Sequence, residues 1–184
     1  MSEYQEPSPD IKRAQVLFDA LRKISTEQAK ESLDKKGIDP KVGIAVAEFP
    51  NLDPIEFEGQ QYYSYAARVL PKKDDGSQPY VTPHNHHKGA EPYVFYGEGE
   101  MNFGNVSEDG EKVKWKPPLK VANGSEVLIQ QAEVHSFRNT GEEPVDFLFA
   151  CPKFHLIDFS DERPEGDRFI VKQLEGGIPS HYSK

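Results

Sequence analysis

Cysteine is nearly absent from this sequence: among 184 residues only Cys151 is present. A single cysteine cannot form an internal disulfide, so nothing indicates an oxidising compartment. Long apolar runs are missing too, since no stretch approaches the roughly 20 residues that a membrane-spanning helix needs. The polar first ten residues hold no apolar run that could act as a signal sequence. We therefore expect a cytoplasmic protein with no membrane association.

Clustered positive charge is a third absence. The chain has 22 Lys and Arg against 31 Asp and Glu, which gives a net charge of −9, and no basic stripe occurs anywhere. Nucleic acid is excluded as an expected partner, because binding its phosphates requires clustered Lys and Arg. The acidity favours solubility and does not identify a ligand.

The N-terminal part of the chain has a helical pattern. Its apolar residues recur at helical spacing and predict an amphipathic helix of about four turns with Asp10 as its N-cap; they are Ile11, Ala14, Leu17, Phe18, Leu21 and Ile24. Ser25 and Gln28 form a capping-box pattern that opens a second, shorter helix, and Gly37 would end it. We expect a helical hairpin that packs outside the main body.

The remainder of the chain has a β pattern. Short strand-like segments separated by Gly or Pro predict an all-β sandwich or small barrel; they are residues 41–49, 61–70, 93–103, 127–131, 134–139 and 145–151. A hairpin is expected at residues 105–115, with Asp109-Gly110 at its turn. The pattern weakens after Pro152.

The chemistry is concentrated in residues 82–99, TPHNHHKGAEPYVFYGEG. Successive side chains of a strand alternate between faces, so His84 and His86 share one face while His87 points away. Glu91 would lie on the opposite face of a continuous strand. A turn or bulge at Gly89 would bring it back to the histidine pair.

A third imidazole, His135, lies in a second strand-like run. Three histidines and a carboxylate suit one divalent transition metal, with Mn, Fe or Ni favoured and Cu, Co or Zn as alternatives. The metal ligands expected here are His84, His86, Glu91 and His135. His155 and His181 are expected to be structural or surface residues, as lone histidines usually are.

These two segments resemble the paired motifs of the cupin superfamily. In the first motif His84, His86 and Glu91 match the family in type and spacing, although the flanking glycines are displaced: five residues separate Glu91 from Gly97 and seven separate it from Gly99, where the family has six. Both halves together, over roughly residues 60 to 152, make the resemblance specific.

The second motif matches in Gly124, His135 and Asn139, whereas Gln130 and Ala132 replace the family's Pro and Gly. These replacements concern a local turn more than the metal ligands. Asn139 is expected to close a turn.

The resemblance implies a jelly-roll barrel, also called a double-stranded β-helix, here preceded by the helical hairpin. It suggests three parts: a tail and helical lead (residues 1–38), the cupin barrel (residues 39–159) and a C-terminal extension (residues 160–184). Acidic barrels with exposed sheet edges commonly pair, so we expect a homodimer.

Strand alternation also predicts a wall of the cavity around the metal. Tyr93 shares the face of Glu91, and Phe137 and Glu133 share the face of His135. Tyr80 and Thr82 lie on the face of His84. The residues expected to contact a small-molecule substrate are therefore Tyr80, Thr82, Tyr93 and Phe137. No Lys or Arg falls in this set, which disfavours a phosphorylated substrate and leaves a free sugar, a uronate or another hydroxy-carbonyl compound.

Within the cupins, the runs AEPYVFYGEGEM and VHSFRNTGEEPVDFLFACP are most similar to the archaeal-type phosphoglucose isomerases. This resemblance implies a metal-dependent aldose-ketose isomerase that forms an enediolate. Glu91 is the base if it leaves the metal; otherwise Tyr93 or Glu133 must act.

Three alternatives use the same ligands. One is a non-haem metal dioxygenase with Fe or Cu. Another is a lyase or decarboxylase that uses Mn or Ni. The third is a non-catalytic cupin that binds a small ligand. The ligand types alone do not choose among them, because metal supply also decides which ion is bound.

Overall fold

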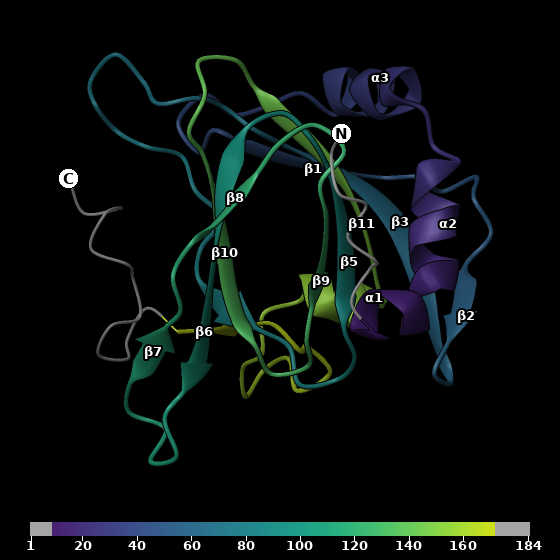
Figure 1. Ribbon diagram of the computed structural model, residues 1–184, viewed down its shortest axis with the longest axis vertical. Coiled ribbons are helices and arrows are strands. Elements are labelled where there is room, and N and C mark those ends of the chain that lie inside the picture. Colours follow the sequence, from purple (N-terminus) through teal and green to yellow (C-terminus); the bar gives the residue numbers. More distant parts are fainter. Residues whose placement is uncertain (1–8, 172–184) are drawn as a thin grey trace, which may run out of the picture.

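The computed structural model describes residues 9–171 and consists mainly of two six-stranded antiparallel sheets with three short helices (Figure 1). The all-β fold with an N-terminal helical lead is confirmed. Residues 1–8 of the tail expected at residues 1–10, residues 172–184 of the expected extension, and His181 lie outside the described residues.

The first sheet has the order β1-β3-β11-β5-β9, and β2 pairs with β3. Its strands are β1 (Ile44–Glu48), β2 (Ile55–Phe57), β3 (Gln60–Val69), β5 (Glu91–Tyr96), β9 (Glu126–Ile129) and β11 (Val145–Cys151). The second sheet has the order β12-β4-β10-β6-β7, and β8 pairs with β6. Its strands are β4 (His84–Asn85), β6 (Gly99–Val106), β7 (Val113–Trp115), β8 (Leu119–Val121), β10 (Val134–Asn139) and β12 (Phe169–Ile170). The hairpin expected at residues 105–115 is the one between β6 and β7.

The N-terminal helices are α1 (Pro9–Arg13), α2 (Gln15–Arg22) and α3 (Thr26–Lys36). The single four-turn helix expected here is wrong, because the backbone leaves the helical conformation at Ala14. This break lets α1 reach β9 while α2 packs on β2 and β5. The second helix is confirmed: Ser25 and Gln28 form the capping box, and Gly37 ends the helix with a φ of 73°.

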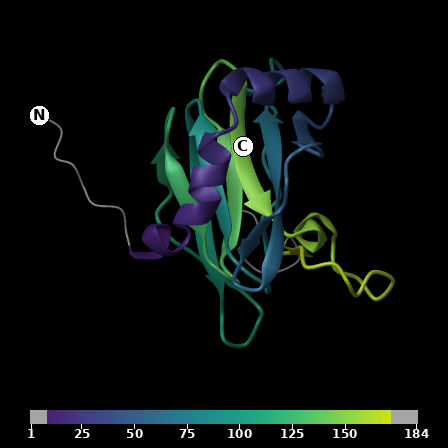
Figure 2. The ribbon, with the colours of Figure 1, turned by 90° about the vertical axis from the view of Figure 1, so that its right-hand side faces the viewer.

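The helices cover the outer face of the first sheet, as Figure 2 shows. Leu17, Phe18, Leu21 and Leu33 are fully or almost fully buried there. Each such side chain contributes about 1.5–3 kcal/mol when it leaves water. No helix within residues 9–171 has both the length and the apolar character needed to cross a membrane.

An aromatic layer fills the space between the sheets. The Phe95 ring lies 5.1 Å from both Phe137 and Phe147, centroid to centroid, and the Phe149 ring stacks on Tyr93 at 5.5 Å. Alternation along each strand sends these side chains inward from both sheets. The layer therefore joins the two sheets into one body.

The strand β12 comes from the C-terminal extension, which the sequence pattern did not resolve into elements. It pairs with β4 through Phe169 opposite Asn85 and Ile170 opposite His84. Because β10 lies on the other side of β4, the short histidine-bearing strand is held on both edges. The extension thereby supports the site.

Candidate metal centre

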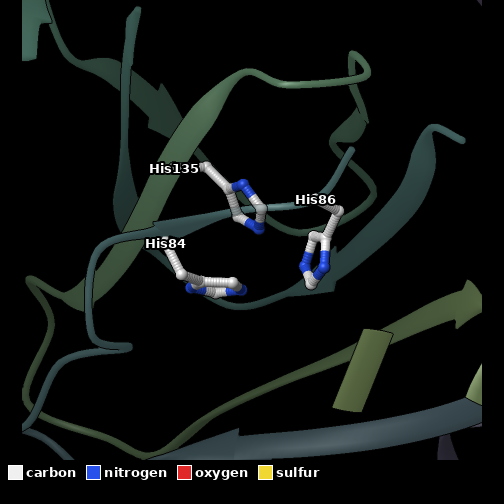
Figure 3. Close-up of side chains that lie close together, drawn as sticks. All are labelled: His84, His86 and His135. Atoms are coloured by element: carbon white, nitrogen blue, oxygen red, sulfur yellow. The ribbon is translucent and has the colours of Figure 1, made fainter. Parts of the chain in front are cut away.

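The three motif histidines converge on one region between the strands (Figure 3). His84 on β4 lies directly opposite His135 on β10, and His86 follows β4 on the same face as His84. Their ligand nitrogens all lie within 4.8 Å of one another, and all three side chains are buried. The shared face expected for His84 and His86 is confirmed. His87 points away and stacks on Phe169 at 4.3 Å.

All three imidazoles are oriented in the same way. Each Nδ1 lies within hydrogen-bonding distance of a backbone carbonyl oxygen: Thr82 for His84 at 2.6 Å, Asp167 for His86 at 3.0 Å, and Glu133 for His135 at 3.1 Å. A carbonyl can only accept, so Nδ1 carries the proton and Nε2 keeps its lone pair. This outer contact is the one that fixes metal-binding histidines in other sites.

Electrostatics keep these rings neutral. Burial lowers the pKa of His86 to about 3 and holds the pKa values of His84 and His135 below the ordinary histidine range. The Nε2 atom of His135 is buried without a hydrogen-bond partner in the described part of the chain. Leaving such an atom unsatisfied costs about 1–3 kcal/mol. A bound cation would satisfy it, so the donor set fits a transition metal.

Glu91 approaches the histidines from the opposite sheet, at the start of β5. The turn expected before it is present: Gly89 has a φ of 100°, and a Cβ there would lie 2.6 Å from the Tyr62 hydroxyl. The Glu91 carboxylate oxygens lie 3.5 Å from Nε2 of His86 and 3.8 Å from Nε2 of His135. The three motif histidines therefore come together in the structure, and Glu91 lies beside two of them, His86 and His135.

Two further groups hold the Glu91 carboxylate. The Tyr93 hydroxyl donates to one oxygen at 2.8 Å, and His155 Nδ1 donates to the other at 2.7 Å. Burial raises the pKa of Glu91, but the neighbouring His86 and the hydrogen bond from His155 outweigh burial and hold this pKa well below its usual range. Glu91 is therefore ionised, as a metal ligand must be.

His155 is a site residue that sequence reasoning missed. It lies on the 3₁₀-helix η1 (Lys153–Leu156), fully buried, and its ring stacks on His86 at a centroid distance of 4.2 Å. Its Nε2 lies 2.6 Å from the carbonyl oxygen of Lys88. No local pattern marks it, because it stands 64 positions from Glu91 and outside both motifs.

A cavity of about 230 Å³ opens beside these ligands. Its wall is mainly apolar and aromatic, formed by Val42, Ile44, Val46, Ala67, Val81, Met101, Phe137, Phe147, Phe149 and Leu156 in addition to polar groups. Thr82, Tyr93 and Phe137 line it where the sequence predicts them. The cavity also includes one cation, Arg168, which the sequence analysis did not expect.

Glu133 and Tyr80 do not line this cavity among the described residues, contrary to their expected places. The Glu133 carboxylate accepts hydrogen bonds from Lys116 Nζ at 2.7 Å and from the Gln130 backbone N–H at 3.2 Å. The strand that carries His135 begins at Val134, so alternation does not extend back to Glu133. Likewise β4 begins only at His84, and Tyr80 forms a separate bridge with Arg138.

Ala132 adopts the left-handed conformation, with a φ of 62°, at the position where the second motif has glycine. A non-glycine residue pays about 1–2 kcal/mol for this conformation. We expect Ala132→Gly to stabilise the protein by about 1 kcal/mol, which raises Tm by about 2–4 °C for a chain of this size. Differential scanning calorimetry measures the shift. Ala122→Gly is the control, because Ala122 is exposed and does not adopt the left-handed conformation, so this substitution should not raise Tm. An unchanged or lower Tm in Ala132→Gly would contradict backbone strain at Ala132.

Solved structures share this architecture. CapF from Staphylococcus aureus, a capsular polysaccharide assembling protein, is 17% identical, with 76% of this chain and 33% of that chain covered at a TM-score of 0.50. A cupin-2 domain protein from Rhodospirillum rubrum is 17% identical over 60% of each chain, with a TM-score of 0.43. The histidine-bearing strands of the two motifs, β4 and β10, are neighbours in one sheet, and Glu91 lies on β5 of the facing sheet. The protein has the cupin fold.

A recombinant oxalate oxidase, solved in complex with glycolate, is also similar, at 22% identity over 65% of this chain and 56% of that chain, with a TM-score of 0.44. The chain thus spans less than two thirds of each of these proteins. No protein-family model and no curated protein matches the sequence. At these identities the likeness concerns the cupin fold alone.

A turn at the end of the second cupin motif is closed by the Asn139 side chain. The Asn139 side chain accepts a hydrogen bond from the Gly141 N–H at 2.8 Å and donates to the Glu143 carbonyl at 2.7 Å. The turn-closing role expected for Asn139 is confirmed. This turn connects β10, which carries His135, to β11 in the other sheet.

Proposed function

We propose that this protein is a metal-dependent isomerase that acts on a small hydroxy-carbonyl compound through an enediolate. The observation that carries this proposal is the cluster of three neutral imidazoles beside a cavity, with the ionised Glu91 carboxylate 3.5 Å from Nε2 of His86 and 3.8 Å from Nε2 of His135. A divalent Mn, Fe or Ni ion held by His84, His86, Glu91 and His135 would polarise a carbonyl and make the neighbouring C–H more acidic.

Glu91 is assigned as the base that removes this proton after its carboxylate leaves the metal. It is the only carboxylate among the described residues that line the cavity. Tyr93 stays protonated and so is not available as the base, because burial and the negative charge of Glu91 raise the pKa of its hydroxyl well above the ordinary value. The Tyr93 hydroxyl instead keeps its proton and orients the Glu91 carboxylate through their hydrogen bond.

The cavity wall supports a compact substrate with an apolar portion. Met101, Phe147 and Phe149 offer no hydrogen bonds, so a sugar with many hydroxyl groups would lose water contacts without replacement. Sites for drug-sized ligands usually have volumes of about 300–1,000 Å³, so this cavity is smaller than such sites. A hydroxy ketone or hydroxy aldehyde with few additional hydroxyl groups fits this wall better than a free sugar.

A dioxygenase is the second candidate, and the aromatic wall of the same cavity favours it. Apolar walls suit a hydrophobic substrate and dioxygen, and a non-haem iron site with open positions can use both. The two candidates differ in their need for dioxygen: a dioxygenase consumes it, and an isomerase does not.

Proton exchange under anaerobic conditions tests the isomerase. Protein loaded with Mn²⁺ is incubated in D₂O with a panel of small hydroxy ketones and hydroxy aldehydes, and deuterium incorporation next to the carbonyl is followed by NMR. We expect incorporation and isomer formation without oxygen, loss of both after chelation, and recovery with Mn²⁺. Turnover only in air would identify a dioxygenase instead. Ligand-induced thermal stabilisation without turnover under either condition would indicate a binding protein.

A further inference from the structure

Arg168 places a positive charge in the wall of the mainly apolar cavity. Of the described residues that line the cavity, it is the only Lys or Arg. The cations close to the motifs in sequence are directed elsewhere. Arg68 pairs with Asp146, and Lys88 lies over the Phe154 ring. The Arg168 side chain is 36% exposed and lines the cavity, so it is the group that can attract an anion there.

The backbone around Arg168 is fixed on both sides. Its N–H donates to the Ile157 carbonyl at 3.1 Å, and its carbonyl accepts from the Phe159 N–H at 3.0 Å. The next residue, Phe169, pairs with Asn85 in the β12–β4 ladder. The preceding residue, Asp167, presents its carbonyl to the metal-site residue His86. The guanidinium is thus carried by a rigid segment that adjoins the metal site.

Asp158 occupies only part of the guanidinium. Its Nε contacts one Asp158 oxygen, and the Arg168 and Asp158 side chains are 36% and 53% exposed. An ion pair this exposed is weak and leaves most of the positive charge effective. Both oxygens of Glu91 are already engaged by Tyr93 and His155.

We infer that the substrate carries a carboxylate that binds Arg168 while its hydroxy-carbonyl end lies at the metal site. This inference rests on the proposed function and narrows its substrate class to small hydroxy-oxo acids with an apolar body. The flat guanidinium offers paired N–H donors that match the two oxygens of a carboxylate. One Arg, with no Lys, among the described lining residues and a cavity of about 230 Å³ suit a carboxylate better than a doubly charged phosphate ester.

Binding of matched acid and amide probes tests this inference without turnover. The probes are 3-oxobutanoate, 4-oxopentanoate and 5-oxohexanoate with their primary amides, titrated calorimetrically into the full-length protein, both chelator-treated and Mn²⁺-loaded. We expect at least one acid of the series to bind about tenfold or more tightly than its amide, in both metal states. Arg168→Met should abolish this preference, and Arg168→Lys should keep part of it.

Arg163→Met is the matched control, because Arg163 is an exposed cation of the same segment that does not line the cavity. It should keep the preference for the acid. Equal binding of acid and amide by the unaltered protein, a preference that survives Arg168→Met, or no acid binding below about 10 mM would each overturn the inference. Failure of isomerisation would leave the preference intact, so the two proposals fail separately.

Discussion

His135→Ala is expected to remove the metal, weakening its binding by at least about a hundredfold. His135 supplies a fully buried Nε2 that has no other partner in the described structure, and alanine provides no ligand to replace it. The site would then keep two histidines and Glu91, with a void where the ring was. Elemental analysis after extensive dialysis should show about one ion per chain in the unaltered protein and almost none in the variant.

His87→Ala is the matched control for this loss. His87 follows the motif pair directly, but it is exposed and stacks on Phe169 outside the cavity. Its metal content should equal that of the unaltered protein. Full metal content in His135→Ala would refute the ligand assignment, and loss of metal from His87→Ala would place the ion on the other side of the strand.

Glu91→Gln is expected to keep most of the metal while lowering isomerase activity by about 10²–10⁴-fold. The amide has the shape of the carboxylate and can still accept the hydrogen bond from Tyr93, but it cannot take up a proton. Metal content and the rate of deuterium incorporation are measured on the same sample. An activity within about threefold of the unaltered protein would show that another group is the base.

Glu133→Gln separates the two carboxylates that the sequence offered as bases. The Glu133 side chain faces Lys116, and only its backbone carbonyl contacts His135, which the substitution leaves in place. We expect the deuterium incorporation rate to stay within about twofold. If Glu133→Gln lost activity and Glu91→Gln kept it, the assignment of the base would be reversed.

The clustering of the proposed ligands could be predicted from sequence, because local geometry brings His84, His86 and Glu91 together. Alternation places His84 and His86 on one face, and a positive φ at Gly89 returns Glu91 to them. The distant His135 was predicted from a spacing that strand pairing then realises, directly opposite His84. Fold class followed from the same short strands and turns.

Two errors arose where alternation was extended beyond the ends of strands. Tyr80 precedes β4 and Glu133 precedes β10, and neither lines the cavity, whereas Thr82 and His86, which also lie just outside β4, do line it. The break at Ala14 was also missed, because the apolar spacing continues through it. The break is explained by packing, because α1 contacts β9 whereas α2 contacts β2 and β5.

His155 and Arg168 could not be predicted, because long-range contacts place them. His155 reaches Glu91 across 64 positions of sequence. Arg168 is positioned by a strand of two residues, β12, that forms only because β4 is there to pair with it. Neither segment has a period or a motif of its own.

An anomalous difference map from crystals of the Mn²⁺-loaded protein is the most direct test of the proposed metal centre. A single strong peak is expected within about 2.3 Å of the Nε2 atoms of His84, His86 and His135 and of a Glu91 oxygen. A cavity without a peak, or a peak bound by other side chains, would contradict the metal centre and the chemistry built on it.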